Sequence, residues 1–180
     1  MFKLEEIDRR AHLLSPGKRV LDLGAAPGSW SRYAAERVGA RGSVVAVDRQ
    51  GVSGLPGNVT VVRADVFAPL DDPADVALAA VLAGAPYDVV LSDMAPATSG
   101  AKVSDQARSH ALFTRALELA VRLGKPGSAY VGKIFMSGDF PEARRAVEAR
   151  YRETRVMKPE GTRRVSTEVY VLGLGLRPGA

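Results

Sequence analysis

The amino-acid sequence predicts an α/β domain with a mostly parallel seven-stranded sheet, helices on both faces and an antiparallel last strand. Short apolar runs alternate along the chain with segments of helical periodicity, the pattern of strands joined by crossover helices. The run 87–92 is centred on three consecutive apolar residues, as in a strand buried on both faces. The segment between residues 156 and 169 reads as a hairpin, which makes the last strand antiparallel.

Turn and capping signals bound each expected element. Ser15-Pro16-Gly17 follows the first helix, Asp72-Pro73 opens the third, Asp105 caps the fourth, and Gly124–Gly127 ends it. In that fourth helix we expect an inward face of Ala107, Ala111, Leu112, Leu117, Ala120 and Leu123. The expected strands span 19–23, 43–48, 59–63, 87–92, 128–135, 151–157 and 168–174, and the helices span 4–14, 29–38, 72–82, 105–123 and 141–150.

Length and composition describe one globular domain over residues 1–180, with 46% hydrophobic and 25% charged residues. The absence of an apolar run of about 18 residues, and a charged start, argue against a membrane span or a secretory signal. With no cysteine and only two histidines, disulfides and thiolate metal sites are excluded, and a histidine metal site or a Ser-His-Asp triad is disfavoured. We therefore expect a cytoplasmic protein without a metal or a membrane partner, and a monomer, because no spare apolar helix face stands out.

The net charge of +5 is unevenly distributed. Residues 150–164 hold six bases and two acids, and the N-terminal segment adds Lys3, Arg9, Arg10, Lys18 and Arg19. Clustered basic residues suggest an anionic partner, most simply nucleic acid. Because the two segments adjoin Glu168 and Lys3 in sequence, we expect their basic residues to flank the site that these two residues belong to. A solvated basic surface also explains any one of these clusters taken alone.

A loop of small residues after the first strand is the expected ligand site. The strand 19–23 ends at Gly24, the loop runs to Gly28, and Trp30 opens a helical pattern. Strand, tight turn and helix start form the arrangement in which open α/β sheets bind ligands, and glycine lets the backbone approach them closely. Asp48 ends the next strand, where its carboxylate can accept hydrogen bonds from both hydroxyls of a ribose.

The spacing of the loop glycines argues against a dinucleotide. The order Gly24-Ala25-Ala26-Pro27-Gly28 lacks the G-x-G-x-x-G fingerprint, and Pro27 removes an N–H that a phosphate would use. A ligand with a ribose but no phosphate fits better, and S-adenosylmethionine is the obvious one. Asp22 either faces the positive charge of that ligand or caps the turn. The alternative is one half of a Rossmann-like fold that binds a different ligand.

Four polar residues stand where a core would not need them: Lys3, Asp93, Lys133 and Glu168. Lys133 lies inside an apolar strand, where an unpaired lysine costs several kcal/mol. We expect Lys133 to emerge at the carboxyl end of its strand beside Asp93, at the same edge as the glycine loop. The alternative is a lysine at the end of a strand that simply reaches solvent.

The chain resembles, over nearly its whole length, the FtsJ/RrmJ family of ribosomal RNA ribose 2′-O-methyltransferases. The resemblance implies a Rossmann-like class I methyltransferase fold, and it maps the K-D-K-E tetrad of the family onto Lys3, Asp93, Lys133 and Glu168. Close bacterial members carry a basic arm before the first tetrad lysine; here it is either absent or removed. The motifs that carry the resemblance are Phe2–Ile7, Asp22–Ser31, Ser92–Pro96, Lys133–Phe135 and Ser166–Tyr170.

The resemblance also implies the ligands. The acceptor would be a ribose 2′-hydroxyl, most simply of a uridine in large-subunit (23S-type) ribosomal RNA within the ribosomal particle. The sequence departs from the family at Ser29, Ala97 and Met136-Ser137, of which the last two lie near the expected RNA entrance. S-adenosylmethionine would contact Gly28, Trp30, Asp48, Asp65 and Asp93, with Gly24 and Val66 as further contacts.

For the chemistry, Lys133 is the candidate base for the hydroxyl proton. A free lysine is protonated at neutral pH, so a neighbouring cation such as Lys3, with partial desolvation, would favour the reactive neutral form. Asp93 favours the charged form and would orient Lys133, and Glu168 would balance Lys3. Alternatively, Lys133 only orients the hydroxyl. The other functions left open are a methyltransferase of tRNA or of an mRNA cap, a small-molecule methyltransferase and a catalytically silent RNA-binding factor of ribosome assembly.

Overall fold

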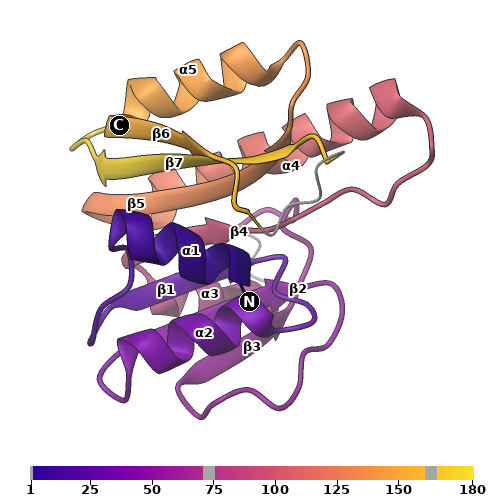
Figure 1. Ribbon diagram of the computed structural model, residues 1–180. Helices are drawn as coiled ribbons and strands as arrows, with labels where there is room; N and C mark the ends of the chain where they lie inside the picture. The colour runs from indigo at the N-terminus through magenta and orange to yellow at the C-terminus, as the bar shows by residue number, and fades with distance from the viewer. Residues whose placement is uncertain (1, 71–75, 161–165) are drawn as a thin grey trace.

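A seven-stranded sheet in the order β3-β2-β1-β4-β5-β7-β6 forms the centre of the molecule (Figure 1). It is seen in a computed structural model that describes residues 2–70, 76–160 and 166–180. Strand β7 is antiparallel to β5 and β6, and the pairs among the other strands are parallel, which confirms the predicted fold class. The strands are β1 (Arg19–Leu23), β2 (Ser43–Asp48), β3 (Val59–Arg63), β4 (Tyr87–Ser92), β5 (Gly124–Phe135), β6 (Tyr151–Met157) and β7 (Glu168–Leu176).

Helices cover both faces of the sheet (Figure 1). Apolar side chains of α1 and α2 pack on one face, and those of α3, α4 and α5 pack on the other, so the sheet separates two hydrophobic clusters. Among the described residues, no helix is both long and apolar enough to cross a membrane. The helices are α1 (Phe2–Ala11), α2 (Ser29–Val38), α3 (Val76–Gly84), α4 (Lys102–Leu123) and α5 (Phe140–Arg150).

The strand directions bring the carboxyl ends of six strands and the start of the seventh to one edge of the sheet. The carboxyl ends of β1 to β6 meet there because β1 to β5 are parallel and β6, which is antiparallel to β7, runs in the same direction. Strand β7 runs the opposite way, and its first residue, Glu168, lies opposite Phe135 at the end of β5. Lys133 lies opposite Tyr170 in the same ladder. Because side chains alternate along a strand, Lys133, Glu168 and Tyr170 share one face.

Helix α1 ends three residues earlier than predicted, at Ala11 instead of residue 14. The buried Asp8 causes this difference: its Oδ1 accepts a hydrogen bond from the backbone N–H of Leu14 at 2.8 Å, which folds the chain back over the helix end. Leu13 and Leu14 lie beyond the end of the helix but are still buried, in the hydrophobic cluster between α1, α2 and the sheet. The apolar pattern was predicted correctly, but a tertiary hydrogen bond ends the helix.

Helix α4 begins at Lys102, so Asp105 lies in its first turn and is not its cap. The carboxylate of Asp105 accepts hydrogen bonds from the backbone N–H and the hydroxyl of Ser99, at 3.0 and 2.9 Å, and holds the preceding loop against the helix. The predicted inward positions Ala107 and Ala111 are wrong, because both are exposed. The buried face includes Phe113 instead.

Strand β5 begins earlier than predicted, and the expected start of the third helix is not tested. The expected start of the third helix at 72–73 lies outside the described residues, and α3 is described from Val76. Strand β5 begins at Gly124 and not at 128, because Gly124 directly after α4 already pairs with Tyr87 of β4. Helix and strand therefore follow each other without the expected loop.

Candidate active site

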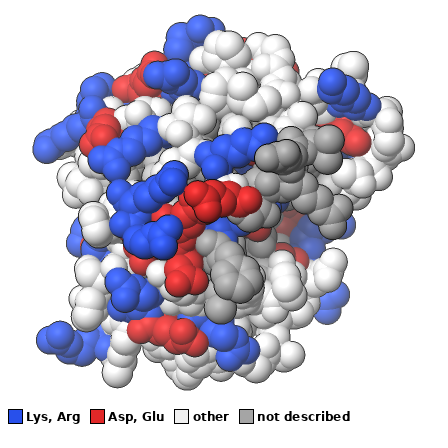
Figure 2. All heavy atoms as spheres, viewed as in Figure 1, with Lys and Arg blue, Asp and Glu red and all other residues white. Residues whose placement is uncertain are grey.

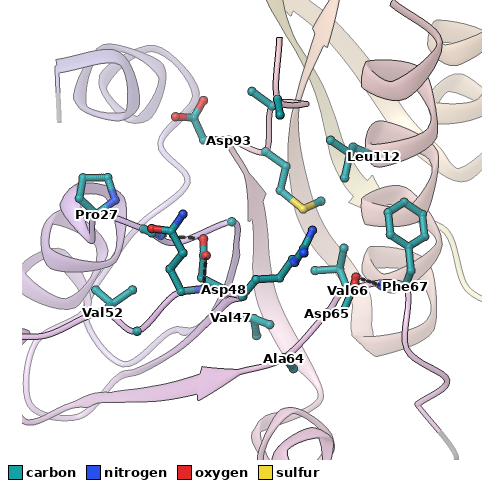
Figure 3. A pocket seen from close by; sticks show the side chains of 18 of the residues that line it. Pro27, Val47, Asp48, Val52, Ala64, Asp65, Val66, Phe67, Asp93 and Leu112 are labelled. Atoms are coloured by element: carbon teal, nitrogen blue, oxygen red, sulfur yellow. Dashed lines mark hydrogen bonds between the residues drawn. The ribbon is translucent and has the colours of Figure 1, made fainter. Parts of the chain in front are cut away.

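An open cavity of about 1070 Å³ lies at the carboxyl edge of the sheet, between the loops that follow β1, β2, β3 and β4 (Figure 3). Five of the residues predicted to bind S-adenosylmethionine line it: Gly24, Asp48, Asp65, Val66 and Asp93. They come from four neighbouring strands, as expected for a ligand site of an open α/β sheet. The structure thus brings most of the predicted ligand residues around one space.

The remaining lining residues were not named as ligand contacts from the sequence, although Ala26 and Pro27 belong to the loop that was predicted as the ligand site. They share one feature, which is that nearly all follow the end of a parallel strand; only Leu112 comes from a helix, α4. Position after a strand was the only available signal, because their side chains have no common chemistry. They are Ala26, Pro27, Val47, Arg49, Gln50, Gly51, Val52, Ser53, Ala64, Phe67, Met94, Ala95, Pro96, Ala97 and Leu112.

Asp48 joins two of the loops around the cavity. Its Oδ2 accepts a hydrogen bond from the backbone N–H of Ala26 at 2.9 Å, and its Oδ1 accepts one from Gln50 at 2.8 Å (Figure 3). Each carboxylate oxygen keeps a second acceptor position. A pair of hydroxyl groups, as on a ribose, therefore fits a carboxylate that the backbone already orients.

Glycine is required at two positions of the loop after β1. Gly24 has a φ of 76°, and a Cβ there would collide with the side chain of Met94. Gly28 has a φ of 110°, and a Cβ there would lie 2.8 Å from Cγ1 of Val52. Side chains are disfavoured at such φ values. The loop can therefore follow this path only because both positions lack a side chain.

Gly28 and Trp30 do not lie on the cavity lining, although both were predicted to contact the ligand. Gly28 precedes α2 and is buried. The Trp30 side chain is 4% exposed and packs against Tyr170, with 5.7 Å between the ring centroids. Trp30 therefore contributes to the core between α2 and the sheet, and its contact with the ligand stays a prediction.

Asp22 does not line the cavity and is fully buried. Its Oδ2 accepts a hydrogen bond from the hydroxyl of Ser31 at 2.6 Å, which ties β1 to the first turn of α2. Its Oδ1 has no hydrogen-bond partner among the described residues. Burial raises the pKa of Asp22 to about 7 against the opposing hydrogen bond from Ser31, and the charges of Asp93 and Asp48 raise it further.

The four tetrad residues come together beside the cavity. Lys133 is only 7% exposed, and its Nζ lies 3.2 Å from Oδ1 of Asp93 and 3.8 Å from Oε1 of Glu168. Lys3, in the first turn of α1, pairs with the other oxygen of Glu168 at 3.0 Å. The lysine of the apolar strand is therefore paired with carboxylates, and the alternative that it reaches solvent is wrong.

Glu168 lies between the two lysines and is ionised at neutral pH. Burial opposes its ionisation, but the hydrogen bond from Lys3 and the charges of Lys133 and Lys3 outweigh it and hold the pKa of Glu168 below its usual range. Charges thus alternate from Lys3 through Glu168 and Lys133 to Asp93. Asp93 also lines the cavity, so it connects the two parts of the site.

Tyr170 completes the cluster and was not predicted to belong to it. Its hydroxyl donates a hydrogen bond to Oδ1 of Asp93 at 2.6 Å. Burial and the charge of Asp93 raise the pKa of Tyr170 well above its usual range, so the hydroxyl keeps its proton and stays a donor. The available signal was its position in the Ser166–Tyr170 motif, two residues after Glu168 and on the same face of the strand.

Lys133 is the residue of the cluster that could take part directly in a reaction. A lysine between two carboxylates is held in one position next to a ligand cavity, where it can orient a hydroxyl or take its proton. Within the described ranges, no group of three or more His, Cys, Asp and Glu side chains is arranged to hold a metal ion.

Basic side chains gather over α1 and β6, with acidic side chains between them (Figure 2). Nη1 of Arg155 donates to the carbonyl of Arg10 at 3.3 Å, and the backbone N–H of Glu160 donates to Oε2 of Glu6 at 2.9 Å. These contacts join the end of β6 to the helix that carries Lys3. We call the exposed residues Arg9, Arg10, Arg155 and Lys158 the basic surface.

Only part of the expected basic cluster lies near the tetrad. Lys18 immediately precedes β1, and Arg19 is the first residue of that strand. Both therefore lie at the amino edge of the sheet, away from the cavity. Arg150 and Arg152 lie at the start of β6, at that same far edge, because β6 runs parallel to β5. The expectation that these bases flank the site is therefore wrong. Arg163 and Arg164 lie outside the described residues.

Two bacterial proteins are similar to this chain along almost its full length. A protein of Sorangium cellulosum is 55% identical over 175 residues, covering 97% of this chain and 79% of the relative, and one of Syntrophobacter fumaroxidans is 46% identical, covering 98% and 88%. Both are named ribosomal RNA large subunit methyltransferase E.

Solved structures agree on the fold. The crystal structure of a Plasmodium falciparum protein described as a ribosomal RNA methyltransferase matches with a TM-score of 0.84 at 22% identity, over 97% of this chain and 95% of that chain. A SAM-dependent O-methyltransferase of Thermotoga maritima matches with a TM-score of 0.66 at 12% identity, over 99% of this chain and 66% of that one. A model of the FtsJ-like methyltransferase family matches residues 1–176. With this match, and with relatives of such identity along almost its full length, the chain belongs to the FtsJ-like methyltransferase family.

Proposed function

We propose that this methyltransferase transfers the methyl group of S-adenosylmethionine to a ribose 2′-hydroxyl of RNA, most simply a uridine of large-subunit ribosomal RNA in the ribosomal particle. The observation that carries the proposal is the buried Lys133 between Asp93 and Glu168, at one end of a ligand cavity. The names of the relatives support the choice of substrate. The proposal includes a monomeric enzyme acting in the cytoplasm.

The cavity fits an extended donor with a ribose and no phosphate. Asp65, Asp48, Gly24 and Asp93 follow four adjacent strands in the order β3, β2, β1 and β4, and three strand spacings cover about 14 Å. Asp48 is oriented for the ribose hydroxyls, and Asp93 faces the positive methionine end. S-adenosylmethionine, when bound, supplies a methyl group on a positively charged sulfur that leaves as a neutral thioether. The adenine then lies toward Asp65, away from the tetrad.

Lys133 takes the proton of the ribose 2′-hydroxyl as the oxygen forms its bond to the methyl carbon. Only the neutral lysine can accept this proton. In the donor-free protein the ion pair with Asp93 holds the lysine, because its Oδ1 lies 3.2 Å from Nζ. A positive ligand at Asp93 competes for that carboxylate. Glu168 stays balanced by Lys3, and Tyr170 keeps Asp93 in place.

RNA reaches the tetrad over the basic surface. The residues of this surface lie on α1 and at the end of β6, next to Lys3 and Glu168. Exposed basic side chains attract the phosphates of an RNA backbone. Phosphate contacts position a nucleic acid without reading its bases. The surface therefore supports an RNA that is recognised by its folded shape, as in a ribosomal subunit.

The test is transfer from methyl-labelled S-adenosylmethionine to large ribosomal subunits, and in parallel to protein-free ribosomal RNA and to tRNA, all from cells that lack this gene. We expect label on a 2′-oxygen of the subunit RNA, found as one alkali-resistant dinucleotide. Label on tRNA alone, or on a base, would contradict the proposed substrate or reaction. No transfer to any of the three, with donor binding intact, would favour a silent assembly factor.

A further inference from the structure

The guanidinium of Arg115, on α4, holds a turn of the cavity wall. Its Nε donates to the carbonyl of Val66 at 2.7 Å, and its Nη2 donates to the carbonyl of Ala68 at 3.0 Å. Its Nη1 also pairs with Glu118 at 3.2 Å, and the Arg115 side chain is 20% exposed. A planar guanidinium that makes three such contacts has one orientation, so the turn is held in one conformation.

The turn that Arg115 holds carries Asp65 and Val66, two of the predicted contacts of S-adenosylmethionine. Oδ1 of Asp65 accepts a hydrogen bond from the N–H of Phe67 at 3.0 Å, and the carbonyl of Asp65 accepts one from Ala68 at 3.0 Å. Asp65, Val66 and Phe67 line the cavity on the side of α4 (Figure 3). The backbone of the turn thus makes hydrogen bonds within itself and to Arg115, while its side chains surround the ligand space.

Helix α4 also contacts the strand end next to Lys133. The hydroxyl oxygen of Ser109 accepts a hydrogen bond from the N–H of Phe135 at 2.9 Å, and Nε2 of Gln106 donates to the carbonyl of Met136 at 3.3 Å. Ser109 and Arg115 are separated by about 9 Å of helix. One rigid helix therefore fixes the turn at the far end of the cavity relative to the strand that carries the tetrad lysine.

We propose that Arg115 is a positioning residue for the adenine end of the methyl donor. It holds the turn of residues 65–68 in the conformation that binds the adenosine half, so the ligand does not bear the entropy cost of ordering it. The inference rests on the proposed function in its choice of S-adenosylmethionine as donor. Arg115 makes no contact with the tetrad residues in the hydrogen bonds and ion pairs of the described chain.

The test measures binding of S-adenosylhomocysteine and of adenosine by titration calorimetry, with steady-state transfer to RNA measured on the same proteins. For Arg115→Ala we expect the Kd of both ligands to rise by the same factor of about ten, which corresponds to about 1.4 kcal/mol. The KM for S-adenosylmethionine rises equally, whereas kcat at saturating donor and the KM for RNA stay unchanged. Arg115→Lys should recover part of the loss, because an ammonium can reach one of the carbonyls.

Two controls separate this role from a general loss of structure. Glu118→Ala removes the ion pair but leaves both bonds to the turn, and it should bind both ligands as the wild type does. Arg144→Ala is the matched arginine control, because Arg144 is exposed on α5 and its ion pair among the described residues is with Glu148, at 2.8 Å. If Arg115→Ala does not fold, Arg115→Lys and Arg115→Gln are compared in its place. Folded variants with the wild-type Kd for both ligands would overturn the proposal.

The result that would contradict this inference differs from the result that would contradict the proposed function. A wild-type protein that does not bind S-adenosylhomocysteine would remove the proposed donor itself. A wild-type protein that binds it, with Arg115 variants that bind equally well, would overturn only the role of Arg115. A loss for S-adenosylhomocysteine without a loss for adenosine would also overturn it, because Arg115 acts only on the adenosine half.

Discussion

The buried carboxyl of Asp22 should make the stability of the protein depend on pH around neutrality. Burial raises its pKa in the folded protein to about 7, from an ordinary value of 3.8. Between these two values the folded protein holds a proton that the unfolded chain has lost. The free energy of unfolding therefore falls as the pH rises, until the folded protein also loses the proton near pH 7.

The size of this effect follows from the difference between the two pKa values. Each unit of difference is worth about 1.4 kcal/mol, so full ionisation of Asp22 costs at most about 4 kcal/mol. Between pH 5.5 and 7.5 the expected loss from this group is about 2 kcal/mol, because the unfolded chain is ionised throughout this range, whereas the folded protein reaches only about three-quarters ionisation at its upper end. Asp22→Asn cannot ionise and should lose this slope.

The measurement is urea unfolding of the donor-free protein at pH 5.5, 6.5 and 7.5, for the wild type and Asp22→Asn. Other groups add to each slope, so the difference between the two proteins is the quantity of interest. Asp139→Asn, at an exposed carboxyl before α5, serves as the matched control and should keep the wild-type slope. Equal slopes for the wild type and Asp22→Asn would refute the assigned ionisation of Asp22.

Two further variants test the loop after β1 and the tetrad. Gly28→Ala should lower stability by about 1–3 kcal/mol, since it places a side chain at a φ of 110° and 2.8 Å from Val52; an unchanged melting temperature would contradict this. Glu168→Gln removes the carboxylate shared by Lys3 and Lys133. Because the pKa of Glu168 is lowered in the folded protein, its stabilisation is present above its unfolded pKa and is lost as the pH falls through its folded pKa. Unfolding at pH 7 and 4 should show the gap between wild type and Glu168→Gln narrowing in acid, and a constant gap would argue against the ion pairs.

The ligand edge was predictable because it depends on strand direction alone. Gly24, Asp48 and Asp93 each follow an apolar run, and parallel strands bring their carboxyl ends to one edge. Lys133 was predictable because a lysine in an apolar strand requires a partner, and Asp93 at the same edge supplies one. These parts of the site follow from chain order and from the cost of burying a charge.

The direction of individual side chains was not predictable in the same way. Trp30 follows the glycine loop in sequence, but packing of α2 turns its side chain toward Tyr170 and not toward the cavity. Lys18 and Arg19 are close to Lys3 in sequence. Most of helix α1 lies between them in the chain, however, so Lys18 and Arg19 lie at the amino edge of the sheet and Lys3 lies at the carboxyl edge. The contacts of Arg115 with the cavity wall have no local sequence pattern, because these partners are backbone carbonyls nearly fifty residues away.

The central claim is that Lys133 takes the proton of the attacking hydroxyl. Its most direct test is single-turnover methyl transfer to large ribosomal subunits by Lys133→Ala, with binding of S-adenosylhomocysteine measured in parallel. Lys125→Ala is the matched control, because Lys125 lies on the same strand but pairs with Asp88 at the opposite edge of the sheet. We expect Lys133→Ala to lose transfer by about 100-fold or more and to keep its ligand affinity, and Lys125→Ala to behave as the wild type. Transfer by Lys133→Ala at the wild-type rate would contradict the account.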